Sequence, residues 1–310
     1  MRIVISEFMD GEAVGALTTG HDTLYDASLV ERRDALLSAV ASADALVVRN
    51  RTRVDAGLLA AAPRLKVVGR LGVGLDNIDV DACRTRGIDV IPATGANALA
   101  VAEYVICTAM MLLRGAYAST TEVAAGQWPR TALSNGREAA AKTLGIVGFG
   151  GIGRLTARLA NALSMRVLGH DANLDTDDRC WRDEGAEPCG LDTLLAQSDV
   201  VTLHVPLVAQ TRNLIDAARI ASMKRGAIVI NTSRGGVVDE AAIAQALTAG
   251  QLGGAALDVF DSEPLAAGSP LAGCPNLVLT PHIAGITAES NARVSHLIAQ
   301  RVLEALAAHR

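Results

Sequence analysis

The sequence has 310 residues, half of them hydrophobic, and a formal net charge of -5 at pH 7. A chain of this length is more often two domains than one. Its charges are scattered and form no basic block, so we expect neither nucleic acid nor an anionic membrane as a partner. Charges also interrupt every apolar stretch before the roughly 20 residues of a membrane helix, which predicts a soluble protein.

The N-terminal and cysteine patterns favour a cytoplasmic location. The opening MRIVISEF lacks the features of a secretory signal and is typical of a first β-strand. The five cysteines are odd in number and include no CxxC pair, as expected for reduced thiols. We therefore predict no disulfide and no metal site at Cys83, Cys107, Cys180, Cys189 and Cys274.

Short β-branched runs alternate with longer helical patterns almost throughout, which is typical of βαβ units around parallel sheets. The runs are nearly all apolar, as expected for strands that are buried on both faces. In chain order the predicted strands are 3–6, 45–48, 67–70, 89–91, 143–148, 166–170, 200–204, 227–232 and 277–280. The predicted fold class is therefore α/β with parallel sheets.

Two helical segments organise the chain into domains. Residues 98–113 are rich in Ala, Leu and Met and predict a long helix between two groups of strands, with a domain boundary near Pro92. Residues 288–310 repeat apolar positions at helical spacing and are expected to pack back on the first domain. The predicted limits are 1–92 plus 286–310 for a discontinuous first domain and 93–285 for the second.

A glycine-rich turn follows the predicted strand 143–148. It reads Gly148-Phe149-Gly150-Gly151-Ile152-Gly153 and leads into a helical pattern, which is the context that a GxGxxG motif requires. The first glycine allows the tight turn, the second lets the backbone approach a pyrophosphate, and the third lets helix and strand pack closely. The motif predicts a dinucleotide site with phosphates at the helix N-terminus.

An acid completes this motif. Asp171 ends the next strand, 18 residues beyond Gly153, where a carboxylate can accept hydrogen bonds from ribose hydroxyls. A 2′-phosphate would meet that carboxylate, and no arginine follows until Arg179, so the pattern favours NAD over NADP. The alternative is a glycine-rich turn with an ordinary surface aspartate.

Three later segments place polar residues beside the ends of apolar strands. INTSRGGVVDE contains Arg234, ALDVFDSEP contains Asp258 and Glu263, and LTPHIAG contains His282. Ligands of open α/β sheets bind beyond the carboxyl ends of the strands, so these side chains are expected to converge.

The segments GFGGIG, HVPL, NTSRGG, ALDVFDSEP and PHIAG, together with RLGVGLDNID, resemble the D-isomer-specific 2-hydroxyacid dehydrogenase family over nearly the whole chain. The resemblance implies an NAD-dependent oxidoreductase that interconverts a small D-2-hydroxy acid and its 2-oxo acid. It also implies two doubly wound parallel-sheet domains, a Rossmann-type cofactor domain inserted in a flavodoxin-like substrate domain, and a homodimer.

The resemblance assigns the chemistry to Arg234, Glu263 and His282. Arginine offers a planar fork that can hold a 2-oxo carboxylate and polarise the carbonyl. Histidine can give a proton to the oxygen at C2 while NADH delivers hydride, and a glutamate bonded to the ring would favour its protonated form. Taken singly, these residues could also be a surface arginine, a turn acid before Pro264 and a structural histidine.

Other cofactor contacts also follow from the resemblance. Asp258 matches the position that contacts the nicotinamide amide, although an acid at a strand end can also cap a turn. The remaining predicted cofactor residues are Val205, Pro206, Thr232, Ser233, His282 and Gly285.

The segment RLGVGLDNID matches the substrate loop of the family. Its residues Gly72, Val73 and Gly74 can expose consecutive N–H groups to a carboxylate unless the segment is a plain β-turn. Asn97 matches a family asparagine near the substrate, or is an N-cap of the long helix. Arg234 is expected to contact the substrate as well.

Arg49, in VVRNRTRV, matches the position at which phosphoglycerate-using relatives hold a phosphate, and ISEFMD and RNRT look most like the branch acting on 3-sulfolactate. An uncompensated cation is costly to desolvate, so Arg49 favours a substrate with a second anion, 3-sulfolactate or 3-phosphoglycerate. Alternatively, Arg49 and Arg51 are solvated loop charges and the enzyme is a general glyoxylate/hydroxypyruvate reductase. Phosphite oxidation and a non-catalytic NAD-sensing co-repressor also stay open, as does the direction of the reaction.

Overall fold

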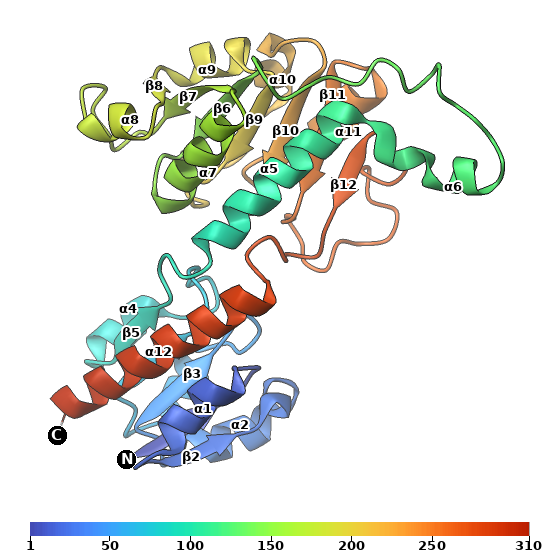
Figure 1. The fold of residues 1–310 in the computed structure, drawn as a ribbon. Coiled ribbons are helices and arrows are strands. Elements are labelled where there is room, and N and C mark those ends of the chain that lie inside the picture. Colours follow the sequence, from blue (N-terminus) through green and yellow to red (C-terminus); the bar gives the residue numbers. More distant parts are fainter. Residues whose placement is uncertain (310) are drawn as a thin grey trace. The chain divides into compact units, whose positions relative to one another are not determined.

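The structure, a computed structural model, describes residues 1–309, apart from the side chains of Ala116 and Ala118. The chain divides into two compact units, each with its own parallel sheet (Figure 1). Unit 1 comprises Met1–Asn97 and Ile286–Arg310, and unit 2 comprises Ala98–Gly285. The predicted α/β class with two doubly wound parallel sheets is confirmed. Within residues 1–309, no helix is both long and apolar enough to cross a membrane.

The sheet of unit 1 has five parallel strands in the order β2-β1-β3-β4-β5, which is the flavodoxin-like order. Successive side chains of a strand point to opposite faces, so Ile3 and Ile5 enter one core cluster while Val4 enters the other. The strands are β1 (Arg2–Ile5), β2 (Asp22–Tyr25), β3 (Ala45–Val48), β4 (Val67–Arg70) and β5 (Asp89–Pro92).

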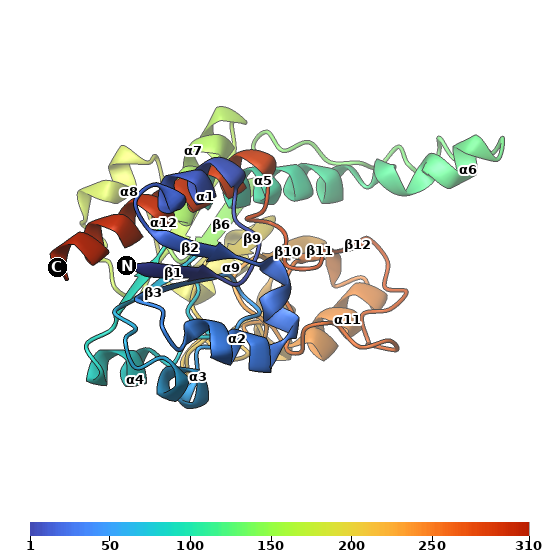
Figure 2. The same ribbon diagram turned by 90° about the horizontal axis from the view of Figure 1, so that it is seen from below.

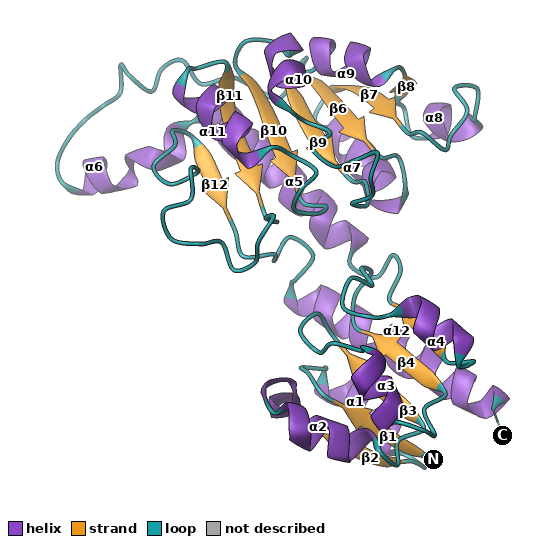
Figure 3. Cartoon of the chain, turned by 180° about the vertical axis from the view of Figure 1, so that it is seen from behind, coloured by secondary structure: helices purple, strands orange, loops and turns teal. Residues whose placement is uncertain are grey.

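Helices cover both faces of this sheet, as Figure 3 shows. Apolar residues of α1 (Gly11–Thr18) and α12 (Ala288–Ala308) form one core with the sheet. Those of α2 (Arg33–Val40), α3 (Ala56–Ala61) and α4 (Val80–Thr85) form the other, and a short 3-10 helix, η1 (Ala27–Glu31), precedes α2.

Helix α12 lies unusually close to the sheet of unit 1. A Cβ atom at Gly69 of β4 would stand 2.7 Å from Val302 and 2.8 Å from Ile298, so glycine is what allows this packing. The helix begins at a capping box formed by Thr287 and Ser290. The predicted C-terminal helix is confirmed as far as Ala308, and it packs on the first domain as expected.

The sheet of unit 2 has seven parallel strands in the order β12-β11-β10-β9-β6-β7-β8. The winding reverses between β6 and β9, and such a switch point is where doubly wound sheets bind ligands beyond their strand ends. The strands are β6 (Thr143–Val147), β7 (Arg166–His170), β8 (Glu187–Pro188), β9 (Val200–Leu203), β10 (Ala227–Asn231), β11 (Leu252–Leu257) and β12 (Leu277–Leu279).

Helices of unit 2 also lie on both faces of their sheet. One core contains residues of α5 (Ala98–Arg114), α7 (Gly151–Ala162) and α8 (Arg179–Asp183). The other contains residues of α9 (Leu191–Gln197), α10 (Ala217–Ser222) and α11 (Glu240–Thr248). After α5 the chain runs out through η2 (Ala116–Ser119) and α6 (Thr120–Ala124), which Figure 2 shows at the far end of an arm.

The nine predicted strands and the three predicted helical segments, which correspond to α5, α7 and α12, are present with small differences at their ends, but three strands were missed. β2 is an edge strand with exposed ends, and β8 has only two residues, one of them proline. β11 reads LGGAAL, a composition that disfavours strands. Its Gly253 is required by packing, because a Cβ there would stand 2.5 Å from the carbonyl oxygen of Gly226.

Candidate active site

The turn between β6 and α7 depends on glycine for close packing. Gly148 has a φ of 95°, and a Cβ on it would stand 2.5 Å from the carbonyl oxygen of His204. A Cβ on Gly153 would collide with the carbonyl oxygen of Gly148. The glycine turn is thereby held against the end of β9. Burial lowers the pKa of His204 to about 4, so its neutral ring adds no charge there.

The N-terminus of α7 is open in the way that a pyrophosphate requires. The N-cap residue is Gly150, so no N-cap side chain bonds to the helix, and a Cβ on Gly150 or Gly151 would meet no atom within 4 Å. No side chain therefore caps the first N–H groups of this helix, at Gly151, Ile152 and Gly153. Their exposed donors and the helix dipole fit an anion.

Asp171 lies beside the glycine turn, as the sequence predicted. Its Oδ2 accepts a hydrogen bond from the N–H of Phe149 at 2.8 Å, and its Oδ1 accepts one from the N–H of Asn173 at 2.9 Å. Each carboxylate oxygen keeps a second lone pair. The acid thus joins the two loops and can still accept hydrogen bonds from ribose hydroxyls.

The loop after β9 contains Val205, which is half-buried, and Pro206, which is exposed. β9 pairs with β6 in parallel, so this loop and the glycine turn leave the sheet at the same edge. The structure therefore places both predicted residues next to the switch point.

A buried asparagine shapes the turn after β10. Asn231 Oδ1 accepts hydrogen bonds from the N–H of Ser233 at 3.0 Å and from its hydroxyl at 2.8 Å, and Asn231 Nδ2 donates to the carbonyl of Arg234 at 2.9 Å. The buried hydroxyl of Thr232 has no hydrogen-bond partner among residues 1–309, so it can bond to a cofactor. Sequence reasoning missed Asn231, although a polar residue ending an apolar strand was a usable signal.

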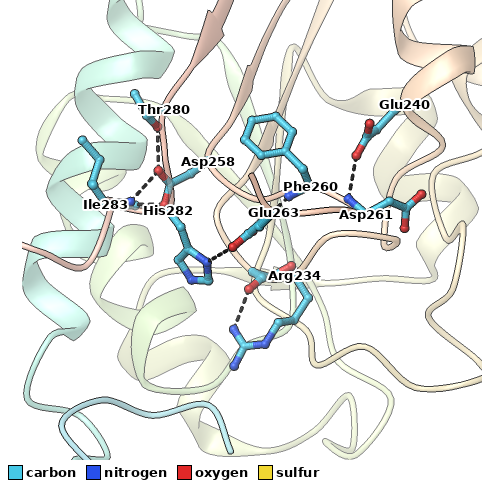
Figure 4. Close-up of polar contacts among 11 residues, drawn as sticks. Arg234, Glu240, Asp258, Phe260, Asp261, Glu263, Thr280, His282 and Ile283 are labelled. Carbon is cyan, nitrogen blue, oxygen red and sulfur yellow. Dashed lines mark hydrogen bonds and ion pairs between the residues drawn. The ribbon is translucent and has the colours of Figure 1, made fainter. Parts of the chain in front are cut away.

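The turn that carries Arg234 packs directly against the loop that carries Glu263. A Cβ on Gly235 would collide with the backbone of Phe260 and Asp261, so the two segments approach as closely as a glycine permits. The strands before them, β10 and β11, are neighbours and end in register at Asn231 and Leu257. The arginine and the glutamate therefore belong to one edge of the sheet, and Figure 4 draws both.

Glu263 makes the hydrogen bond to histidine that the sequence predicted. His282 Nδ1 and Glu263 Oε2 are 2.9 Å apart (Figure 4), with 42% and 38% of the two side chains exposed. Glu263 Oε1 also accepts the N–H of Phe260 at 3.2 Å, so the acid shapes its own turn as well. Because Nδ1 faces a carboxylate it carries a hydrogen, which leaves Nε2 for proton exchange with a substrate.

Asp258 holds the loop in which His282 lies. This acid is only 1% exposed and accepts hydrogen bonds from the hydroxyl of Thr280 at 2.6 Å and from the N–H groups of Ile283 and Ala284 at 2.8 Å. His282, at a φ of 57°, donates its own N–H to the carbonyl of Asp258. The turn-capping alternative thus holds, while a nicotinamide contact through Oδ2 stays a prediction.

Tyr104 of α5 extends this network. Its hydroxyl lies 2.6 Å from that of Thr280, and the single hydroxyl hydrogen of Thr280 points to Asp258, so Tyr104 is the donor. Burial raises the pKa of Tyr104, and the charge of Asp258 adds to that effect. Thr280 lies in the segment LTPHIAG but was not singled out there, and Tyr104 has no sequence motif that would have revealed it.

Unit 1 contains the predicted substrate loop. The N–H of Gly72 donates to the carbonyl of Arg70 at 2.8 Å, so the prediction that it is exposed to a ligand was wrong. The N–H groups of Val73 and Gly74 have no hydrogen-bond acceptor among residues 1–309, as expected of a site for a carboxylate. Asn97 precedes α5, but its buried Oδ1 has no partner among the same residues. It therefore does not cap the helix.

Arg49 follows β3 in a loop that a buried acid holds in place. Glu7, 5% exposed, accepts hydrogen bonds from the N–H groups of Arg49 at 2.8 Å, Thr52 at 2.9 Å and Arg51 at 3.2 Å. The side chain of Arg49 is half-buried and donates through Nη2 to Asn291 Oδ1 at 2.8 Å. Burial lowers its pKa below the ordinary value, an effect that Glu7 partly offsets.

Comparison with known proteins identifies the family. Residues 106–284, more than half of the chain, match the model of the D-isomer specific 2-hydroxyacid dehydrogenase NAD binding domain. The chain belongs to this family. It is therefore an NAD-dependent dehydrogenase, and the open N-terminus of α7, Asp171 and the unpartnered hydroxyl of Thr232 fit the cofactor.

The chain is also similar to individual proteins over nearly its whole length. It is 55% identical over 305 residues to an (S)-sulfolactate dehydrogenase of Chromohalobacter salexigens, covering 98% of both chains. It is 37% identical over 303 residues to a D-3-phosphoglycerate dehydrogenase of Archaeoglobus fulgidus, covering 98% of this chain and 57% of that protein. The crystal structure of the TT0316 protein from Thermus thermophilus has a TM-score of 0.88 at 33% identity, with 99% of this chain and 97% of that chain covered.

Proposed function

We propose that the protein interconverts 3-sulfolactate and 3-sulfopyruvate, with NAD as the hydride carrier. The observation that carries this proposal is the environment of Arg49, a half-buried guanidinium that forms no ion pair with any carboxylate of residues 1–309. An unneutralised, partly desolvated cation is stabilised by an anionic ligand. A substrate with a sulfonate at C3 supplies that anion, in addition to its carboxylate.

The substrate contacts follow from the donors that each segment offers. The carboxylate at C1 binds the N–H groups of Val73 and Gly74 and the fork of Arg234. The same arginine polarises the oxygen at C2, Asn97 is a further contact, and Arg49 binds the sulfonate. In this scheme residues 1–92 with 286–310 form the substrate domain and 93–285 the cofactor domain.

His282 handles the proton. When bound, NAD would supply the hydride acceptor for C2 in the oxidation. His282 Nε2 takes the proton of the C2 hydroxyl, and the Glu263 carboxylate at Nδ1 stabilises the imidazolium that results. In the reduction, the same nitrogen returns the proton to the oxygen at C2.

The proposed cofactor contacts use hydrogen-bonding groups of the protein that can accept a further partner. The N–H groups of Gly150, Gly151, Ile152 and Gly153 would hold the pyrophosphate of NAD, and Asp171 would accept hydrogen bonds from a ribose of the cofactor. The other residues that would contact NAD are Val205, Pro206, Thr232, Ser233, Asp258, His282 and Gly285. Thr232 offers its buried hydroxyl, and Asp258 Oδ2 accepts only one of the hydrogen bonds described above.

Configuration and charge agree with this substrate. Sulfur gives the CH₂ group of sulfolactate priority over the carboxylate, so the (S) form has the D arrangement of groups that the family recognises. A phosphate would satisfy Arg49 equally, and the similarity to a D-3-phosphoglycerate dehydrogenase supports 3-phosphoglycerate as the second candidate. The higher identity to the (S)-sulfolactate dehydrogenase favours the sulfonate.

Initial rates of NADH oxidation test the proposal. The substrates are sulfopyruvate, phosphohydroxypyruvate, hydroxypyruvate, glyoxylate, pyruvate and phenylpyruvate at equal ionic strength. We expect sulfopyruvate to give the highest kcat/KM and the monoanionic acids values at least roughly tenfold lower. A higher kcat/KM with glyoxylate or pyruvate would show a general short-chain 2-oxo acid reductase, and no turnover of any acid would favour a sensor.

We also propose a cytoplasmic homodimer. The segment after α5, which contains η2 and α6, exposes large apolar side chains that a second copy would cover. The exposed fractions are 61% for Tyr117, 43% for Val123 and 78% for Trp128. The five cysteines are free thiols, in agreement with a reducing compartment. Light scattering after size exclusion should give twice the chain mass, and Trp128→Asp should lower it; a monomeric parent protein would exclude the dimer.

A further inference from the structure

The side chain of Arg49 has only neutral contact partners, although the charge of Glu7 acts on it from a distance. Nη2 donates to the amide oxygen of Asn291, and the guanidinium carbon lies 5.9 Å from the centre of the Phe8 ring. Arginines on neighbouring segments differ, because Arg51 pairs with Glu31 at 3.0 Å and Arg33 pairs with Asp55. Asn291 thus occupies the place in which an acid would neutralise Arg49.

We propose that Asn291 is a specificity-determining residue, whose neutral amide orients Arg49 without cancelling its charge and so selects substrates with a second anionic group at C3. The inference rests on the proposed function, because it assumes that Arg49 binds that group. Asn291 Oδ1 engages only Nη2, and Arg49 Nε and Nη1 have no acceptor among residues 1–309. Those nitrogens are the donors for a sulfonate or phosphate.

The backbones of both Arg49 and Asn291 are fixed by hydrogen bonds, so the contact between their side chains joins two well-positioned residues. The backbone of Arg49 is fixed by Glu7 and by Asn77, whose Nδ2 donates to the carbonyls of Arg49 at 3.3 Å and Thr52 at 2.7 Å. Asn291 lies in the first turn of α12 and donates its N–H to the carbonyl of Thr287 at 3.0 Å. The charge of Glu7 is already engaged by three backbone N–H groups.

Replacing the amide by a carboxylate isolates the effect of charge. Asn291→Asp keeps an acceptor of nearly the same size at hydrogen-bond distance from Arg49, but it neutralises the cation and repels an incoming anion. A hydrogen bond to a charged group corresponds to roughly ten- to a hundredfold in affinity. The variant should therefore raise the KM for sulfopyruvate and phosphohydroxypyruvate by that factor.

The expected signature is confined to one kinetic constant and one class of substrate. The kcat, the KM for NADH and kcat/KM with pyruvate should stay within about threefold of the parent enzyme. A threefold change is smaller than the roughly tenfold change that one pKa unit represents. Gln300→Glu is the matched control, because it makes the same amide-to-acid change on an exposed face of α12. It should leave all constants unchanged.

Two further variants separate charge from structure. Asn291→Ala removes the orienting contact without adding charge and should lower selectivity for the doubly charged acids less than Asn291→Asp. In an Arg49→Ala background Asn291→Asp should have no further effect on selectivity, since the two act through one contact. Equal losses with pyruvate and sulfopyruvate, or additive effects in the double variant, would overturn the inference.

The failures of the two proposals are distinguishable. A parent enzyme without preference for doubly charged acids refutes the proposed function. A parent enzyme with that preference, retained in a folded Asn291→Asp variant, refutes only the role of Asn291. Thermal unfolding of each variant establishes that it is folded.

Discussion

Two loops, one in each unit, are built in the same way and differ in one respect. The loop after β3 presents Arg49, and its N–H groups bond to the buried Glu7. The loop after β12 presents His282, and its N–H groups bond to the buried Asp258. In each, a buried acid replaces the missing hydrogen bonds of an irregular backbone.

The difference lies in the side-chain partner. His282 faces the carboxylate of Glu263, whereas Arg49 faces the amide of Asn291. A proton donor needs a partner that stabilises its charged form, and a carboxylate does so. A cation that recognises a second anion must keep its charge, which a neutral partner allows. Under the proposed function, the same scaffold thus serves proton transfer in one unit and anion recognition in the other, and the side-chain partner decides which.

The largest expected effect is the loss of the proton donor. His282→Ala should lower kcat by about a hundredfold or more, because a positioned acid-base group contributes on that scale. NADH should still bind, since the glycine turn and Asp171 are intact. Stopped-flow titration and steady-state rates measure both quantities, and a kcat within tenfold of the parent would show that the loop after β12 is not catalytic.

The corresponding change in unit 1 should be selective. Arg49→Ala removes a charge-assisted contact of about 1.5 to 3 kcal/mol, so kcat/KM for a doubly charged acid should fall roughly ten- to a hundredfold. A singly charged acid should be nearly unaffected. The ratio of kcat/KM values for sulfopyruvate and pyruvate reports this, and equal losses would mean that Arg49 does not bind the second anion.

Asp171 extends the comparison to an acid that holds a loop and that we propose also contacts the cofactor. We expect NAD to be preferred over NADP by at least about tenfold, because an unfavourable charge pair in a partly buried site amounts to roughly 1.4 kcal/mol. Asp171→Ala should shrink that preference, although the loss of its bond to Phe149 N–H also loosens the turn. Equal kcat/KM with both cofactors in the parent enzyme would remove this role.

The partner of the histidine can be neutralised directly. Glu263→Gln keeps a hydrogen-bond acceptor near Nδ1 but no longer stabilises the imidazolium, so the reductive reaction should lose activity at a lower pH than in the parent enzyme. The pH profile of kcat/KM for the 2-oxo acid is the measurement. Superimposable profiles would show that the carboxylate only orients the ring.

The sequence predicted those features of the site that consist of local patterns. The glycine turn with Asp171 was inferred because it combines a strand end with a distinctive motif, and the hydrogen bond between Glu263 and His282 was implied by the family resemblance of the segments that contain them. The residues that support them were missed. Tyr104 reaches Thr280 across 176 positions, and Asn291 reaches Arg49 across 242, so no local pattern could reveal these contacts.

The smallest effect concerns an ion pair outside both loops, and it gives the comparison a baseline. In unit 2, Arg158 binds both carboxylate oxygens of Glu184, whose side chain is 8% exposed. The hydrogen bond from Arg158 lowers the pKa of Glu184 despite the opposing effect of burial. Glu184→Gln should therefore lower the Tm at pH 7, modestly because 63% of the Arg158 side chain is exposed, without changing kcat.

The pH dependence of this effect has a definite sign. A carboxyl group with a lower pKa in the folded than in the unfolded state contributes stability above its unfolded pKa of about 4.3, and that contribution disappears as the pH falls. The Tm difference between the parent enzyme and Glu184→Gln should thus be largest near neutrality and should vanish in acid. A difference that is the same at pH 7 and well below pH 4 would assign the loss to packing instead. A change in kcat would show that this ion pair is coupled to the active site. The comparison of the two loops would then have to include Arg158 and Glu184 as well.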